Sequence, residues 1–119
     1  MNREELLRPL FDQPEEVPPL DGWDLVPGYI DGQHAATAMM RGPEIHFGVA
    51  PSFRRRAVLR QRTREFLAPL LARHGYLTTR VLVTSRDKQA FVQRVGFKPT
   101  WSDGIFQYYL LGHLPFERS

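Results

Sequence analysis

One stretch decides the fold that this sequence predicts: residues 44–62, Glu-Ile-His-Phe-Gly-Val-Ala-Pro-Ser-Phe-Arg-Arg-Arg-Ala-Val-Leu-Arg-Gln-Arg. It opens as a short apolar run, passes through a Pro-Ser turn and continues as a basic segment with apolar residues at helical spacing, a pattern that predicts strand, turn and helix. The first turn of a helix has unpaired N–H groups and the positive end of the helix dipole. A helix start with three arginines beside it predicts a site for an anionic ligand.

The helix that begins in this stretch is expected to run from residue 53 or 54 to His74 and to end at Gly75. Pro69 removes a backbone hydrogen bond from it, which costs about 3 kcal/mol in an ideal helix and predicts a kink or a break near Glu65. Its apolar stripe consists of Leu59, Thr63, Phe66, Leu67, Leu70 and Leu71.

Turn and stop signals predict the remaining C-terminal elements. These are a strand at 76–84, a helix at 85–95 stopped by Gly96, and strands at 97–101 and 105–111 joined through residues 102–104. Because a helix separates them, the strand at 76–84 is expected to run parallel to the one at 44–49 through a right-handed crossover.

On the N-terminal side, Asp31-Gly32 predicts a tight hairpin between strands at 23–30 and 33–40. Pro27 indicates an edge position or a bulge in the first of these strands. A second turn at 41–43 leads into the strand at 44–49. The first 22 residues are expected to form a short helix within 2–12, limited by Pro9, and a proline-rich connector.

The composition is that of one globular domain of 119 residues, divided into 1–22, 23–49 and 50–111. There is no cysteine, and no stretch approaches the roughly 20 apolar residues that cross a bilayer. We expect a cytoplasmic location, or a virus particle filled from the cytoplasm. The four histidines lack the spacing of metal ligands, so no metal is expected.

The net charge of +3 is unevenly distributed. Residues 1–24 carry seven acids against two arginines, and the remainder carries 14 Lys and Arg against six acids. This favours either a basic face for a phosphate-bearing partner or a solvated, arginine-rich surface. The arginines at 54–64 lie on several helix faces without interleaved aromatic residues, which makes nucleic acid an unlikely partner.

Two segments, residues 49–56 and 85–97, resemble the phosphate-loop turn and the later helix ending in Gly-Phe of the GCN5-related N-acetyltransferase (GNAT) superfamily. Small acetyltransferase-like proteins encoded by bacteriophages are particularly similar. The resemblance implies an α/β fold of the α+β mixed-sheet type. It would have N-terminal antiparallel strands, a central parallel strand pair joined by a helix crossover, and a C-terminal hairpin. Acetyl-CoA would lie between two splayed strands.

Carried onto this chain, the resemblance implies that the main chain of Phe47, Gly48 and Val49 pairs with the pantetheine arm of coenzyme A. Ser85 stands where the family has an asparagine. Leu59 stands where the family has a small residue, and Val92 where it has a proton-donating tyrosine. The pyrophosphate and the adenosine phosphate are assigned to Arg54, Arg55, Arg56, Ala57, Val58, Leu59 and Arg60, with Arg86 as an alternative for the latter.

Acetyl transfer to an amine needs a base that removes a proton from the ammonium group and an acid that donates a proton to the departing sulfur. Glu44 and His46 share one strand face, and both are candidates for the base. The alternative is that Glu44 is an exposed residue at the start of the strand and that His46 is a hydrogen-bonded histidine of the core. Tyr108 is the candidate acid, with Tyr109 on the opposite face, and either tyrosine also suits simple packing in a strand.

The sequence therefore predicts an acetyl-CoA-dependent N-acetyltransferase acting on an unknown amine. The alternative is a catalytically inactive protein of the same fold that serves as a binding module in phage structure or assembly. Its partners would be another copy of the chain or a virion protein, and no membrane is expected.

Overall fold

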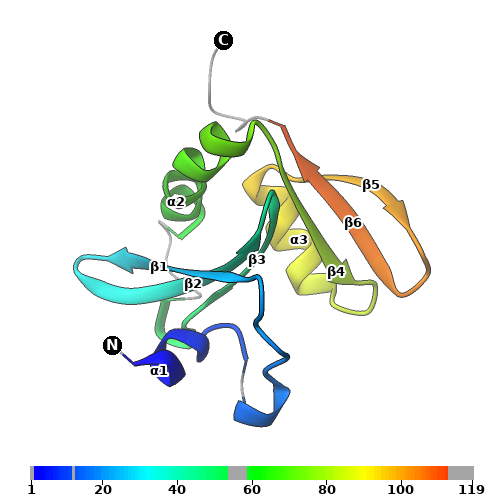
Figure 1. Cartoon of the computed structure of the whole chain (residues 1–119). Coiled ribbons are helices and arrows are strands. Elements are labelled where there is room, and N and C mark those ends of the chain that lie inside the picture. Colours follow the sequence, from blue (N-terminus) through cyan, green and yellow to red (C-terminus); the bar gives the residue numbers. More distant parts are fainter. Residues whose placement is uncertain (1, 12, 54–58, 113–119) are drawn as a thin grey trace. The chain divides into compact units, whose positions relative to one another are not determined.

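The computed structural model describes residues 2–11, 13–53 and 59–112. The chain falls into two compact units, residues 1–59 and 60–119. Figure 1 labels their helices and strands. None of the helices within the described ranges is long and apolar enough to cross a membrane. The predicted order of helices and strands is confirmed in both units.

The N-terminal unit is built on three antiparallel strands, β1 (Asp24–Ile30), β2 (Gln33–Arg41) and β3 (Glu44–Val49), with β2 in the middle. Asp31 and Gly32 both have positive φ, 51° and 79°, as the predicted two-residue turn requires. The register of β1 shifts between Gly28 and Tyr29, close to Pro27, so the expected edge position and bulge are both confirmed.

A short helix and the residues after it pack against this sheet. Helix α1 (Arg3–Leu7) lies within the predicted 2–12 and ends before Pro9, and Asn2 caps it by accepting a hydrogen bond from the Glu5 amide. The buried Thr37 hydroxyl donates to the carbonyl oxygen at Leu6 over 2.5 Å. Two short 3-10 turns, Pro14–Glu16 and Pro51–Phe53, complete the unit.

The C-terminal unit contains α2 (Leu59–His74), β4 (Leu77–Leu82), α3 (Arg86–Val95), β5 (Lys98–Ser102) and β6 (Phe106–Leu111). Its strands are antiparallel in the order β4-β6-β5. Helix α2 continues through Pro69, so the alternative of a broken helix is wrong. It ends at Gly75 as predicted, where φ is 81° and the amide bonds to the Leu71 carbonyl.

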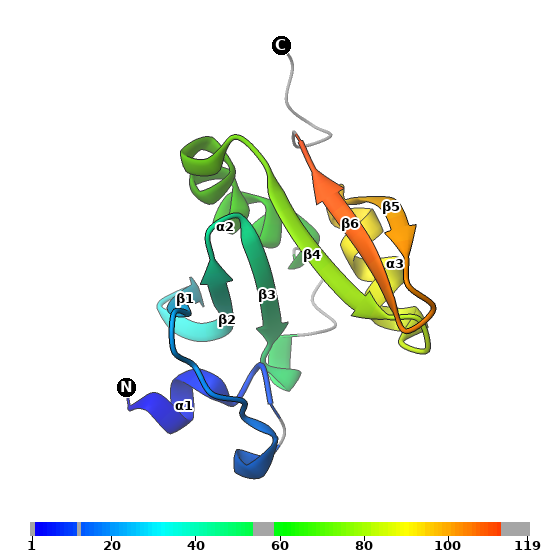
Figure 2. The ribbon, with the colours of Figure 1, turned by 45° about the vertical axis from the view of Figure 1, so that its right-hand side comes forward.

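The sheet of this unit has two unlike faces. Figure 2 shows α3 behind the three strands, and the side chains on that side form the core: Leu77, Val81, Tyr109 and Leu111, with Val92, Val95, Phe97, Leu67 and Leu71. We call the opposite side the outer face. It carries Arg80, Leu82, Lys98, Trp101, Phe106, Tyr108 and Leu110. Within residues 60–112, no helix covers it (Figure 2).

Candidate functional site

Glu44 and His46, the two candidates for the base, form a hydrogen-bonded pair on β3. Their side chains share one face by the two-residue period of the strand, and His46 Nε2 lies 2.7 Å from Glu44 Oε2. Both side chains are about one quarter exposed, at 23% and 26%. An acid and an imidazole at this distance act as a unit, because the carboxylate accepts the Nε2 proton and orients the ring.

The pair has two neighbours that the sequence did not single out. The ring of Trp23 meets the His46 imidazole edge-on at 5.6 Å between centroids. The Arg41 guanidinium lies over the Trp23 ring at 4.3 Å and reaches Glu44 Oε1 at 3.5 Å. No local pattern would have found these contacts, because they depend on the pairing of β1 with β2 and of β2 with β3.

The three predicted pantetheine-binding residues differ in the direction of their main-chain hydrogen-bonding groups. The amide of Ala50 bonds to the carbonyl of Ala35. Hydrogen bonding alternates along an antiparallel pair, so the Gly48 main chain bonds toward Thr37 on β2. By the same alternation, the main-chain groups of Phe47 and Val49 point away from β2.

Gly48 also allows a close approach by the N-terminal segment. A Cβ atom at this position would overlap the carbonyl group of Pro9, which is main chain and cannot rotate away. Glycine is therefore required here for packing within the N-terminal unit.

The predicted phosphate-binding segment is described only in part. Arg54, Arg55, Arg56, Ala57 and Val58 lie outside the described residues. Leu59 and Arg60 are the first two described positions of α2, and their predicted roles toward the phosphates stay predictions.

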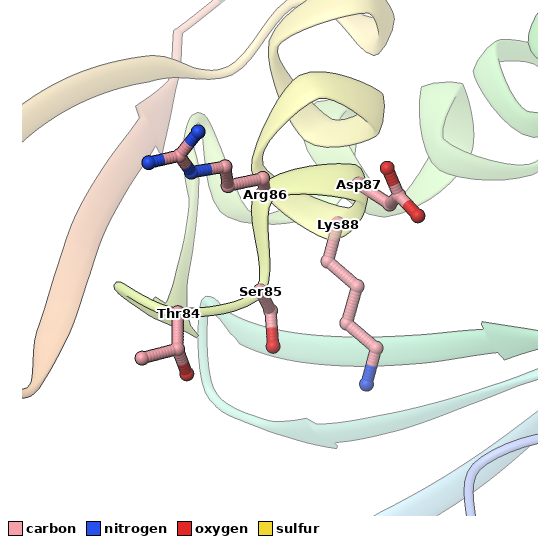
Figure 3. Close-up of a pocket in the computed structure, with 5 residues that line it drawn as sticks. All are labelled: Thr84, Ser85, Arg86, Asp87 and Lys88. Carbon is pink, nitrogen blue, oxygen red and sulfur yellow. The ribbon is translucent and has the colours of Figure 1, made fainter.

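The N-terminus of α3 borders an open cavity of about 400 Å³, lined by Thr84, Ser85, Arg86, Asp87 and Lys88 (Figure 3). Ser85 occupies the N-cap position, but its hydroxyl makes no capping hydrogen bond. Figure 3 shows the Ser85 hydroxyl and the Lys88 side chain directed to the same side, and the Arg86 guanidinium directed away from Lys88. Helix amides and a lysine at a cavity favour an anionic or carbonyl-bearing group.

The two tyrosines of β6 face opposite sides, as expected. The half-buried Tyr108 donates its hydroxyl proton to Asp103 Oδ2 at 3.3 Å and stacks on Trp101. Tyr109 is 2% exposed, and its hydroxyl donates to Gln89 Oε1 on α3 at 3.1 Å. The hydroxyl that reaches α3 therefore belongs to Tyr109.

Gln89 is a positioning residue that the sequence did not reveal. Its amide nitrogen donates to the carbonyls of Leu82 and Val83 at the end of β4, at 3.2 and 2.9 Å. Its amide oxygen accepts from Tyr109, and the Gln93 amide donates to the same hydroxyl at 3.4 Å. These bonds fix the start of α3, and with it the cavity at Ser85, against β4 and β6.

Several solved acetyltransferases have similar folds. A GNAT family acetyltransferase from Elizabethkingia anophelis, solved with acetyl-CoA bound, matches with a TM-score of 0.64 and 13% identity, covering 93% of this chain and 90% of that one. A chimera of the spermidine N-acetyltransferase SpeG from Vibrio cholerae matches with a TM-score of 0.59 and 9% identity, over 76% and 68% of the two chains.

The N-acetyltransferase PseH from Campylobacter jejuni, in complex with acetyl coenzyme A, matches with a TM-score of 0.53 and 16% identity. That match covers 70% of this chain and 62% of PseH, so this chain spans less than two thirds of that protein. No protein-family model and no curated protein sequence matches.

The chain has the GNAT acetyltransferase fold. The fold class expected from residues 49–56 and 85–97 is thereby confirmed, in a chain that matches the Elizabethkingia enzyme over 93% of its own length. At these identities the likeness carries the fold alone. The roles assigned to Glu44, His46, Tyr108 and the coenzyme-binding residues of the GNAT-fold chain stay predictions, as does its organisation as a single domain.

Proposed function

We propose that this protein transfers an acetyl group from acetyl-CoA to an amine. The observation that carries the proposal is the Glu44–His46 pair, an acid–base unit on β3 of a chain with the acetyltransferase fold. Two of the similar structures were solved with acetyl-CoA, which supports the choice of acyl donor.

His46 is the proposed base and Glu44 the group that positions it. When the Nε2 proton is donated to Glu44, the neutral ring carries its lone pair on Nδ1. That atom is the one able to accept a proton from an ammonium acceptor. The carboxylate then stabilises the imidazolium that forms, because the hydrogen bond becomes charge-assisted on both sides.

The chain offers groups that suit coenzyme A in each unit. Acetyl-CoA would supply the acetyl group as an activated thioester. Phe47, Gly48 and Val49 keep their predicted role toward the pantetheine arm. The Ser85 end of α3 offers helix amides at a cavity. Arg54 to Arg60 keep their predicted role toward the phosphates.

Proton donation to the departing sulfur is proposed for Tyr108, as the sequence suggests. Tyr109 is the second hydroxyl to test, because its contacts with Gln89 and Gln93 bring it to α3, the helix that carries Val92 in place of the expected tyrosine.

Binding and turnover test the proposal separately. Calorimetry at low salt is expected to show binding of acetyl-CoA, and thiol release is expected with at least one member of a panel of amines that includes polyamines. His46→Ala is expected to retain binding and lose turnover, whereas His74→Ala, at the end of α2, serves as the matched histidine control. Absence of acetyl-CoA binding would overturn the proposal.

A binding module without catalysis is the second candidate. The observation that favours it is the engagement of the Tyr108 hydroxyl with Asp103, together with a buried valine at position 92. Binding of acetyl-CoA without thiol release across the amine panel would support this candidate. For this candidate we propose a phage protein located in the virion, whereas a cytoplasmic location is proposed otherwise, and the partner is a second copy of the chain or a virion protein.

A further inference from the structure

The outer face of the C-terminal unit carries exposed aromatic and aliphatic side chains. The register pairs Arg80 with Tyr108 and Leu82 with Phe106, which brings these four side chains together on one side of the sheet. Leu82 is 45% exposed and Leu110 40%, whereas the residues on the α3 side are buried. An apolar patch of this kind indicates a binding surface.

Trp101 gives the face a flat platform. Its ring stacks on Tyr108 at 4.5 Å between centroids with an interplanar angle of 1°. The side chain is still 59% exposed, so one side of the indole is covered by Tyr108 and the other is open. A rigid, open aromatic ring is what an unpaired nucleic-acid base stacks on, regardless of its sequence.

The charge of the unit suits a phosphate backbone. Residues 60–112 contain nine Lys and Arg against three Asp and Glu, a net charge of +6 (9 − 3). On the outer face itself, the Arg80 guanidinium lies 4.6 Å from the Phe106 ring centroid, and Lys98 is paired with Leu110. The nearest acid, Asp103, accepts hydrogen bonds from the Ile105 and Phe106 amides and from Tyr108.

The exposed edge of β5 argues against a second copy of the chain that pairs edge to edge with this sheet. Pro99 has no amide proton to donate, and the register shifts between Pro99 and Ser102. Both features interrupt the ladder that edge-to-edge pairing needs. A nucleic-acid duplex is unsuitable as well, because its base faces are hidden in the stack.

We propose that the outer face binds single-stranded nucleic acid, with bases stacking on Trp101 and phosphates contacting Arg80 and Lys98. The sequence had made nucleic acid an unlikely partner, because the arginines at 54–64 have no aromatic residues between them. The aromatic residues come instead from β5 and β6, and only the strand pairing brings them beside Arg80 on β4.

The test is fluorescence anisotropy with labelled single strands of deoxythymidylate and of uridylate, titrated with the full chain at several salt concentrations. Trp101→Ala is expected to weaken binding by about fivefold or more, the low end of the loss for one stacked base. Arg80→Gln is expected to lower the slope of log K against log salt concentration by about 0.7. Tyr29→Ala, an equally exposed aromatic residue of the N-terminal unit, is the control and should bind as the unaltered protein does.

Three outcomes would overturn the proposal: no binding of either strand at low salt, equal affinity for the Trp101→Ala and Tyr29→Ala variants, or equal affinity for a duplex of the same length. Sedimentation is run in parallel. A dimer that Trp101→Ala converts to a monomer, without any binding of the single strands, would assign the face to a second copy instead. Circular dichroism shows whether each variant is folded. If Trp101→Ala does not fold, the result with Arg80→Gln still tests the proposal.

Discussion

His46 Nε2 lies 2.7 Å from Glu44 Oε2, two residues earlier on the same strand. If this pair is the base, His46→Ala should lower kcat/KM for acetyl transfer about 100-fold or more. Glu44→Gln should cost about tenfold, the value of one hydrogen bond to a charged group. Steady-state rates of thiol release measure both, and an unchanged kcat/KM in His46→Ala would exclude His46.

The close approach of Pro9 to Gly48 predicts a large effect from a single methyl group. Gly48→Ala should destabilise the protein by about 1–3 kcal/mol, because the new Cβ would overlap a main-chain carbonyl. Urea unfolding measures the change. Gly112→Ala is the matched control, since a Cβ there meets no atom within 4 Å, and it should change stability by less than about 0.5 kcal/mol.

The hydroxyl of Tyr109 is expected to matter for stability. Tyr109→Phe removes the donor to the half-buried Gln89 side-chain oxygen, at a cost of about 0.5–1.5 kcal/mol, the net value of one hydrogen bond. Thermal and urea denaturation measure this loss. Tyr76→Phe removes a hydroxyl from a side chain that is 46% exposed and should be nearly neutral. Equal effects from the two substitutions would contradict the assigned role of Gln89.

The contribution of Asp103 to the stability of the protein should decrease in acid. The Phe106 and Ile105 amides, with the Tyr108 hydroxyl, hold the pKa of this carboxyl below its ordinary value of 3.8. The contribution of a carboxyl with a lowered pKa is fully present above that ordinary value and is lost as pH falls through the folded-state pKa. The difference in Tm between the unaltered protein and Asp103→Ala should therefore shrink in acid. A difference that stays constant from pH 7 to pH 2 would contradict this.

The sequence predicted the features that depend on neighbouring residues. Asp31-Gly32 forms the expected hairpin because both positions need positive φ, and Glu44 and His46 meet because a strand repeats every two residues. It could not predict contacts set by pairing between distant segments. Trp101 reaches Tyr108 only through the shifted register of β5.

The N-terminal segment shows the same limit. Pro9 correctly indicated a short first helix, but nothing in its neighbourhood indicated that its carbonyl lies against Gly48. A close approach of two segments that lie far apart in the sequence leaves no local signal, and only the structure shows why position 48 is a glycine.

The two tryptophans lie one in each unit, Trp23 beside His46 and Trp101 on Tyr108. Each unit thus contains its own fluorophore. With Trp23→Phe or Trp101→Phe, the emission of the remaining indole follows the unfolding of one unit alone. Coincident transitions would mean that the halves of the chain melt cooperatively, and separate transitions would mean that each is a folding unit in its own right.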